Sequence, residues 1–143
     1  MPTHSDSELN EGFDWDLLVE SRLNAILCGD SESVDLGLAS LCNHLQLPLH
    51  EWSLRDGSPA PSIHTGTLIV TDVAGTTLDE QRAFLAWLDA HHAVRVITLS
   101  ESPLYDLVRN GVMLEHLYYR LNPIYCALDG SCISDSLGRI SAA

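Results

Sequence analysis

Lysine is absent from this sequence: all seven basic residues are arginine, and they face 20 acidic residues, for a formal net charge of −13. Without lysine, the chain has neither a phosphate-gripping lysine nor a Schiff-base lysine. The negative charge argues against binding to nucleic acid, because that binding depends mainly on neutralising phosphates. An anionic membrane surface would repel the chain for the same reason. We therefore expect neither nucleic acid nor a membrane among its partners.

Long apolar runs and targeting signals are also missing. No window approaches the roughly 18 consecutive apolar residues of a transmembrane helix. The N-terminus, MPTHSDSELNEGFDWD, has neither the basic start nor the apolar centre of a signal peptide. These absences favour a cytoplasmic protein, in which cysteines are expected to be buried thiols rather than disulfides. No CxxC pair is present, and we expect no metal and no cofactor; the cysteines are Cys28, Cys42, Cys126 and Cys132.

The sequence does contain enough apolar material for one folded domain, since 45% of its 143 residues are hydrophobic. Apolar runs alternate with segments of helical periodicity, which is typical of an α/β three-layer sandwich with a mostly parallel, five-stranded sheet. We expect this domain at residues 14–130, between a flexible acidic tail at 1–13 and a C-terminal tail at 131–143. The predicted strands are 24–28, 48–54, 67–71, 93–99 and 124–128. The predicted helices are 14–22, the segment 34–47 ended by Pro48, 77–91, 103–110 and 114–121.

The first predicted strand–turn–helix is where a phosphate-binding loop of the form GxxxxGK[ST] would lie. In residues 29–36 only Gly29 fits this frame, while Val34, Asp35 and Leu36 occupy the positions of the second glycine, the lysine and the hydroxyl. Nearby carboxylates also oppose the attraction of a helix N-terminus for anions. We therefore expect a capped helix start here rather than a tight ATP site.

Two further places could carry chemistry. Asp72 follows the strand at 67–71, and carboxylates at the carboxyl edge of a parallel sheet are placed for ligands, although a helix cap or loop anchor is the commoner role. The run Tyr118-Tyr119-Arg120 fits either a helix with one tyrosine in the core and the arginine stacked on the other, or an arginine presented at a subunit edge. The histidines form no metal-binding pattern, and no GxSxG motif is present.

Three blocks follow one another in a familiar order: GTLIVTDVAGTTLDEQRAFLAWLD, VRVITLSES and PLYDLVRNGVMLEHLYYRLNP. Their order and spacing resemble the AAA+ ATPase domain of the sigma-54-dependent transcriptional activators, the bacterial enhancer-binding proteins. The resemblance covers residues 24–128 and is most specific at 66–67 and 117–122. It implies a P-loop NTPase, AAA+-like fold in a degenerate, truncated form, without the helical lid subdomain.

The departures from that family fall on its chemical residues. At the family's metal-binding Asp and catalytic Glu stand Thr71 and Asp72, and its sensor Thr-Asn pair becomes Ser100-Glu101. Of its two candidate arginine fingers, the first falls at Leu114 and is lost, and the second falls at Arg120 and is kept. Between 54 and 66 only a short loop replaces the sigma-54-contacting GAFTGA insertion. The resemblance thus leaves vestigial nucleotide-binding positions at Gly29, Asp35, Thr71, Asp72 and Ser100.

Phosphoryl transfer needs a lysine, a metal ligand, a water-orienting carboxylate and a neighbour's arginine, and each lost part costs several kcal/mol. The sequence therefore predicts no enzyme. It predicts a module that regulates transcription by protein–protein interaction through Tyr118, Tyr119 and Arg120, with a sigma-54 activator or a second copy of itself as partner. One alternative is a regulator that still binds ATP weakly at Gly29 and Asp72. Another is an unrelated enzyme that uses Asp72 and a histidine at the carboxyl edge of the sheet.

Overall fold

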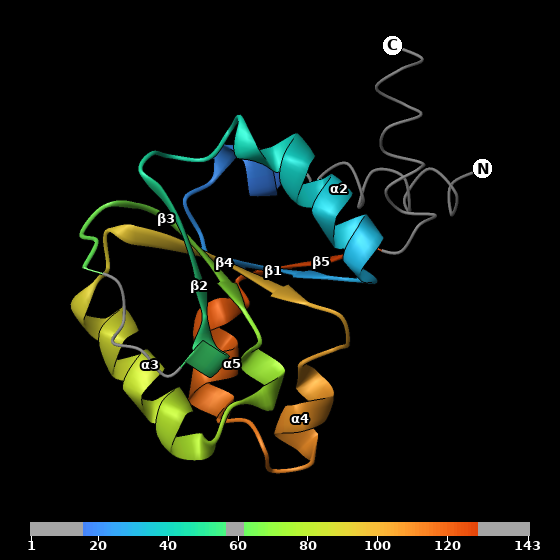
Figure 1. Cartoon of the computed structure of the whole chain (residues 1–143), viewed down its shortest axis with the longest axis vertical. Coiled ribbons are helices and arrows are strands. Elements are labelled where there is room, and N and C mark those ends of the chain that lie inside the picture. The colour runs from blue at the N-terminus through green and yellow to red at the C-terminus, as the bar shows by residue number, and fades with distance from the viewer. Residues whose placement is uncertain (1–15, 57–61, 129–143) are drawn as a thin grey trace.

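The sheet of the computed structural model has five strands, all parallel, in the order β2-β3-β4-β1-β5 (Figure 1). The structure describes residues 16–56 and 62–128, so the predicted tails at 1–13 and 131–143 lie outside the described residues. This architecture confirms the predicted α/β sandwich, with strand ends within about one residue of those expected from the apolar runs. The strands are β1 (Ala25–Cys28), β2 (Leu49–Ser53), β3 (Gly66–Thr71), β4 (Val94–Ser100) and β5 (Ile124–Ala127).

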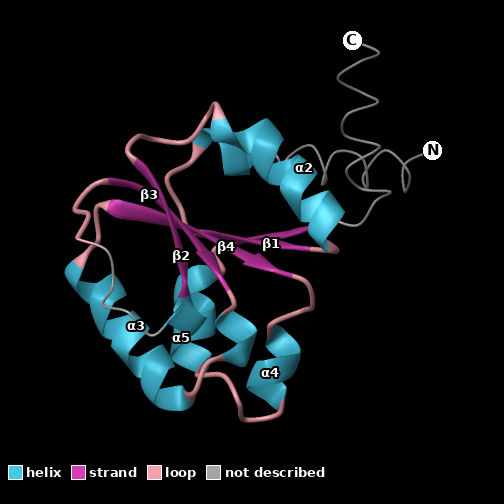
Figure 2. Cartoon of the chain, in the orientation of Figure 1, coloured by secondary structure: helices cyan, strands magenta, loops and turns pink. Residues whose placement is uncertain are grey.

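Helices cover both faces of the sheet, as Figure 2 shows. Helix α2 (Ser31–Cys42) lies on one face, and α3 (Leu78–Ala90), α4 (Tyr105–Arg109) and α5 (Glu115–Leu121) lie on the other. Residues 16–20 are also helical, inside the helix predicted at 14–22. Two short 3-10 turns, η1 (Leu54–Asp56) and η2 (Val73–Gly75), follow β2 and β3 at the same edge of the sheet. In the described part of the chain, no helix is both long and apolar enough to cross a membrane.

The prediction that the helix before Pro48 continues to that proline is wrong. The helix α2 ends at Cys42, with Asn43 as its C-cap. Asparagine competes for backbone hydrogen bonds and favours helix ends, and the chain tightens there, with His44 N–H donating to Leu41 O at 2.8 Å. The turn lets Leu45 bury its side chain, which is 7% exposed, before β2 begins.

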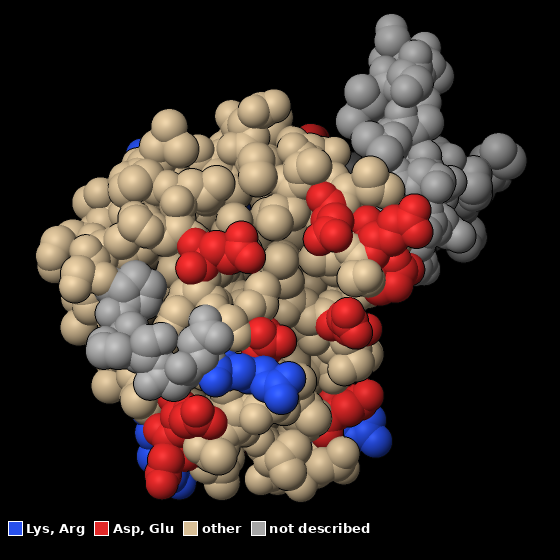
Figure 3. Space-filling view, in the orientation of Figure 1, with Lys and Arg blue, Asp and Glu red and all other residues tan. Residues whose placement is uncertain are grey.

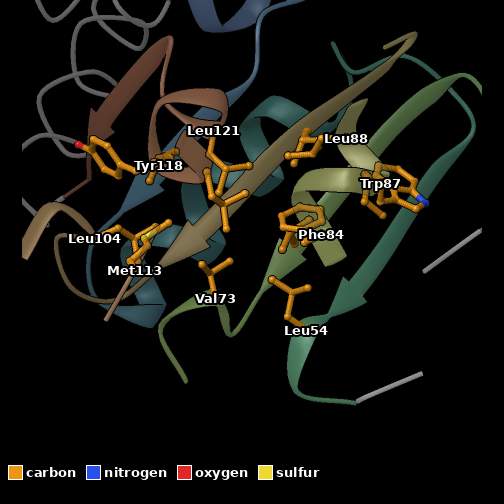
Figure 4. Packing of buried hydrophobic residues seen from close by; sticks show 14 of the residues in the cluster. Leu54, Val73, Phe84, Trp87, Leu88, Leu104, Met113, Tyr118 and Leu121 are labelled. Carbon is orange, nitrogen blue, oxygen red and sulfur yellow. The ribbon is translucent and has the colours of Figure 1, made fainter. Parts of the chain in front are cut away.

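The core has two parts, one on each face of the sheet, because alternate strand side chains point to opposite faces. In β1, Ile26 packs with the cluster under α3 and α5, and Leu27 packs with the cluster under α2. The first cluster is the aromatic one (Figure 4), in which the Trp52 and Phe84 rings meet edge to face at 5.5 Å. Burial on both faces explains why the inner strands β1 and β3 are apolar without alternation, whereas the edge strand β2 is exposed over its first three residues.

Helix α3 owes its position to polar contacts as well as to its apolar face. Its N-terminus carries a capping box, in which Thr77 N–H donates to Glu80 at 2.8 Å and Glu80 N–H donates to Thr77 Oγ1 at 3.1 Å. Gln81, 1% exposed, donates to the carbonyl of Val112 at 2.9 Å and accepts from Leu114 N–H at 2.7 Å. Gln81 therefore ties α3 to the start of α5, a role that its helical spacing alone did not indicate.

The glycine that opens the Gly66–Thr67 block is required by the backbone. Gly66 has φ +96°, and a Cβ there would lie 2.2 Å from the carbonyl oxygen of Pro48. Thr67 N–H donates to the same oxygen at 3.0 Å, so β2 and β3 approach closely at this point. A side chain at position 66 would be strained and would push the two strands apart.

Two of the thiols follow the sequence-based expectation that they form no disulfide. Cys28 and Cys42 are free, and Cys28 and Cys126 are buried. Cys132 lies outside the described residues.

Candidate functional site: two pockets at opposite ends of the sheet

A pocket of about 430 Å³ lies at the carboxyl edge of the sheet, beyond the ends of β3 and β4. This is the edge at which open α/β sheets hold their ligands. Four of the five vestigial nucleotide-binding positions line it, namely Asp35, Thr71, Asp72 and Ser100. The fold thus brings together residues that are far apart in the sequence, as the resemblance implied.

Gly29, the fifth position, does not line this pocket. A Cβ on Gly29 would lie 1.8 Å from the backbone oxygen of Leu128, and Gly29 N–H donates to Ser100 O at 3.0 Å. The glycine therefore serves the close packing of the chain after β5 against the end of β1. Close approach of a phosphate is not needed to explain it.

The turn between β1 and α2 is short and is closed by a carboxylate. Only Gly29 and Asp30 separate the strand from the helix, which begins at Ser31. Asp30 caps the helix by accepting from Ser33 N–H at 2.8 Å and from Ser33 Oγ at 3.1 Å. The backbone hydrogen bond from Ser33 is the main cause that lowers the pKa of the Asp30 carboxyl group. A carboxylate thus occupies the position where a helix N-terminus would bind a phosphate.

Residues 29–36 therefore do not form the loop that the Walker frame describes. From Ser31 onward they are helical, and Asp35 lies in the second turn of α2, where its exposed carboxylate faces the pocket. The predicted capped helix start is confirmed. A frame assigned by counting residues from Gly29 places Asp35 correctly at the pocket, but on a helix rather than in a loop.

Asp72 anchors the loop at the end of β3. It adopts a left-handed conformation, with φ 63° and ψ 28°, and makes no side-chain cap to η2. Its Oδ2 accepts from the hydroxyl of Ser53 and from Thr71 Oγ1, the latter at 3.3 Å. Asp72 thus joins the ends of β2 and β3, which matches the loop-anchor role predicted as the commoner one.

The chemistry of this carboxyl-edge pocket is acidic. Asp35, Asp72 and Glu101 line it, against one lining cation, Arg55. No histidine lines it, so the described residues provide no site for an enzyme that pairs Asp72 with a histidine. The described residues also hold no group of three histidine, cysteine or carboxylate side chains suited to a metal ion. Figure 3 shows acidic side chains outnumbering basic ones on the face in view.

The Tyr118-Tyr119-Arg120 run of α5 divides between core and surface. Tyr118 is only 7% exposed, its ring contacts Tyr119 at 5.4 Å, and burial raises the pKa of its hydroxyl. The prediction that Tyr118 belongs to the interaction surface is therefore corrected, because its ring packs in the core beneath α5. Tyr119 is 55% exposed, and the Arg120 guanidinium pairs with the carboxylate of Asp89 on α3.

A second pocket, of about 440 Å³, lies at the opposite, amino edge of the sheet. Sequence reasoning did not find it, because its lining comes from separate segments that only the sheet brings together. The signal that was present is an arginine inside an apolar strand, Arg95 in β4. The charged and aromatic residues of the lining are Arg22, His91, His92, Arg95, Tyr119 and Arg120.

The five-stranded parallel sheet with helices on both faces is an α/β fold like that of P-loop NTPase domains. No protein-family model matches the chain, and no curated protein matches it in sequence. Among solved structures, it is similar to the P-loop NTPase domain of the sigma-54 transport activator from E. coli, with a TM-score of 0.64 and 17% identity. That match covers 87% of this chain and 95% of the E. coli domain.

The chain is also similar to NtrX from Brucella abortus, in a structure that was solved in complex with ATP. The TM-score is 0.64 and the identity 13%, over 94% of this chain and 40% of the NtrX chain. The chain thus spans less than half of the length of NtrX. These matches confirm, at the level of the fold, the resemblance to the ATPase domain of the sigma-54 activators.

Proposed function

We propose that this chain is a non-catalytic module of transcription regulation. It has a fold of the sigma-54-activator type and acts by contacting another protein. One observation carries the proposal: Asp30 caps a helix that begins only two residues after β1, where an ATPase would hold the triphosphate. A carboxylate there repels phosphates, and a two-residue turn has too few backbone N–H groups to surround them.

The surface at the amino edge supports a role in protein contacts. Leu23 and Tyr119 are 50% and 55% exposed there, beside the half-buried Arg120. Tyrosine and arginine are the side chains that contribute most often to the energetic centre of protein interfaces. The partner in this proposal is an active sigma-54 activator, or a second copy of the chain.

The test mixes the chain with the ATPase domain of an active sigma-54 activator and follows both complex formation and ATP hydrolysis. We expect a complex and a lower rate of hydrolysis, because a position filled by this chain has no lysine to hold a phosphate. Tyr119→Ala should abolish both effects, whereas Tyr105→Ala, at an exposed tyrosine of α4, should leave them intact. The proposal would be contradicted if the two proteins failed to co-purify and the rate of ATP hydrolysis stayed the same at a large excess of the chain.

A second candidate function is a regulator that binds ATP weakly. The observation in its favour is the carboxyl-edge pocket itself, which keeps its volume and one cation, Arg55. Calorimetry with ATP and Mg²⁺ separates the two functions. Heat that saturates at millimolar ATP and disappears in Arg55→Gln would favour the nucleotide-binding regulator, and an absence of heat would favour the purely interacting module.

A further inference from the structure

The amino-edge pocket is basic in an otherwise acidic protein. Three of the seven arginines line it, together with the adjacent His91 and His92, and no carboxylate is among its lining residues. The whole chain carries a net charge of −13. A cationic concavity inside such a protein concentrates anions locally, because the low-dielectric walls focus the field of its charges.

Arg95 forms the buried floor of this pocket. Its side chain rises from β4 and is 5% exposed as a residue. Its Nε–H donates to Leu23 O and one terminal N–H donates to Leu18 O, both at 2.7 Å. Two of the five guanidinium donors are therefore used, and both partners are neutral carbonyl groups. Burial lowers the pKa of Arg95, and no carboxylate of a described residue bonds to it.

A buried charge is normally paired with an opposite charge. Among the described residues that line the pocket, Arg120 has such a partner in Asp89, which is not a lining residue and whose side chain is 62% exposed. The Arg22 guanidinium donates to the neutral side-chain oxygen of Gln46, at 2.7 and 2.9 Å. The pocket thus keeps a positive charge that the described chain does not balance.

Aromatic packing fixes the ring of His91, one of the two histidines that line the pocket. The His91 ring stacks on Trp87 at 4.1 Å with an interplanar angle of 10°, and its Nδ1 lies 2.7 Å from the Trp87 carbonyl oxygen. Because the carbonyl oxygen can only accept, Nδ1 carries the hydrogen of that bond. The ring is therefore fixed in orientation before any ligand binds, which reduces the entropic cost of binding.

We propose that the amino-edge pocket binds a small molecule with two or more oxyanion groups, carboxylate or phosphate, between Arg22, Arg95 and Arg120. Planar guanidinium groups match both oxyanions with paired hydrogen bonds. The volume of about 440 Å³ suits a ligand of metabolite size. This site is separate from the carboxyl-edge pocket, and its test uses the chain alone, so that it succeeds or fails independently of the proposed contact with an activator.

The experiment titrates the purified chain with citrate and with pyrophosphate at constant ionic strength, following the melting temperature and the heat of binding. We expect saturable stabilisation by at least one probe, because a ligand that binds only the folded state shifts unfolding. Citrate alone would assign carboxylate ligands, and pyrophosphate alone would assign phosphate ligands. Binding of both would support the shared oxyanion chemistry. No saturable binding of either probe at millimolar concentration would overturn the proposal.

Three variants locate the binding. Arg22→Gln and Arg120→Gln should each weaken the affinity about tenfold, as expected for the loss of a charge-assisted hydrogen bond. Asp89→Asn should strengthen it, because it frees the Arg120 guanidinium. Arg109→Gln is the matched control, an exposed arginine of α4 paired with Asp106 at 3.5 Å. An equal loss of affinity in the control and in the two pocket variants would mean diffuse screening of charge and would refute the site.

Discussion

The two ends of the sheet carry opposite chemistry on one fold. At the carboxyl edge, Asp35, Asp72 and Glu101 face a single lining arginine, and Asp30 closes the helix start. At the amino edge, three arginines line a pocket of nearly the same volume without any lining carboxylate. The comparison shows that one parallel sheet can present carboxylates at the edge that holds ligands in open α/β folds and arginines at the opposite edge. In our proposal, the opposite edge is the one that binds anions.

The largest expected effect concerns the packing at the carboxyl edge. Gly29→Ala should lower the free energy of unfolding by about 3 kcal/mol, because the new Cβ would lie 1.8 Å from a backbone oxygen that cannot move without displacing β5. Gly75→Ala is the control, since the nearest atom to its Cβ would be a side-chain atom of Arg55 at 3.5 Å. Urea unfolding followed by circular dichroism measures both. Equal stability of Gly29→Ala and the wild type would disprove the packing role of this glycine.

At the amino edge, Arg95→Met should cost about 2 kcal/mol of stability. The substitution keeps most of the apolar stem but leaves the carbonyl groups of Leu18 and Leu23 without their donors. Arg82→Met is a control at an exposed arginine of α3, for which we expect a change below about 0.5 kcal/mol. A thermal or urea midpoint for Arg95→Met that matches the control would show that the buried guanidinium does not hold the helical residues 16–20 to the sheet.

These two variants test positions that differ in how far the sequence predicted them. The strands were predictable because buried parallel strands are apolar on both faces, as in Ala25–Cys28 and in the β3 core. Asp72 was predictable because it follows a parallel strand at the carboxyl edge of the sheet, whereas Thr71 and Ser100 were placed there by the resemblance to the sigma-54 activators. A capped helix start after the first strand also followed from the sequence, which did not single out Asp30 as the cap.

Other features depended on tertiary contacts that no local pattern encodes. The end of α2 at Cys42 is set by the turn that buries Leu45, so a downstream proline was a misleading stop signal. Tyr118 is buried and Tyr119 is exposed because of how α5 packs. Two adjacent tyrosines in a sequence do not show which of them faces the core. The amino-edge pocket joins residues near positions 22, 95 and 120, and only the finished sheet brings these together.

A smaller effect concerns pH and the cap at the carboxyl edge. The pKa of Asp30 is lowered in the folded state, so its ionised form stabilises the fold at neutral pH. That contribution is present above the ordinary carboxyl range and is lost as the pH falls through about 4 towards the folded-state pKa. The stability difference between the wild type and Asp30→Asn should therefore shrink from pH 7 to pH 3. A difference that grows as the pH falls would contradict this sign; Asp35→Asn, at an exposed carboxylate of the same helix, is the control.

The smallest expected effect is none. Restoring the phosphate-gripping residues with Val34→Gly, Asp35→Lys and Leu36→Thr should leave the heat of mixing with ATP and Mg²⁺ at the baseline of the parent chain. The restored side chains would stand on a helix that already begins at Ser31, without a loop to wrap a phosphate. Millimolar or tighter ATP binding by this triple variant would contradict this expectation. It would show that the side chains at positions 34–36, rather than the short turn, prevent the parent chain from binding ATP.

The strand order has a consequence for how this protein is made. The strand β1 comes first along the chain yet lies inside the sheet, where Ala25 is paired with Ile97 on one side and with Ile124 on the other. During synthesis, β1 has no neighbour in the sheet until β4 has emerged, and its second neighbour, β5, emerges only at the end of the described chain. Strand pairs that are distant in the sequence form slowly, and the apolar surface of β1 stays exposed to solvent until they form.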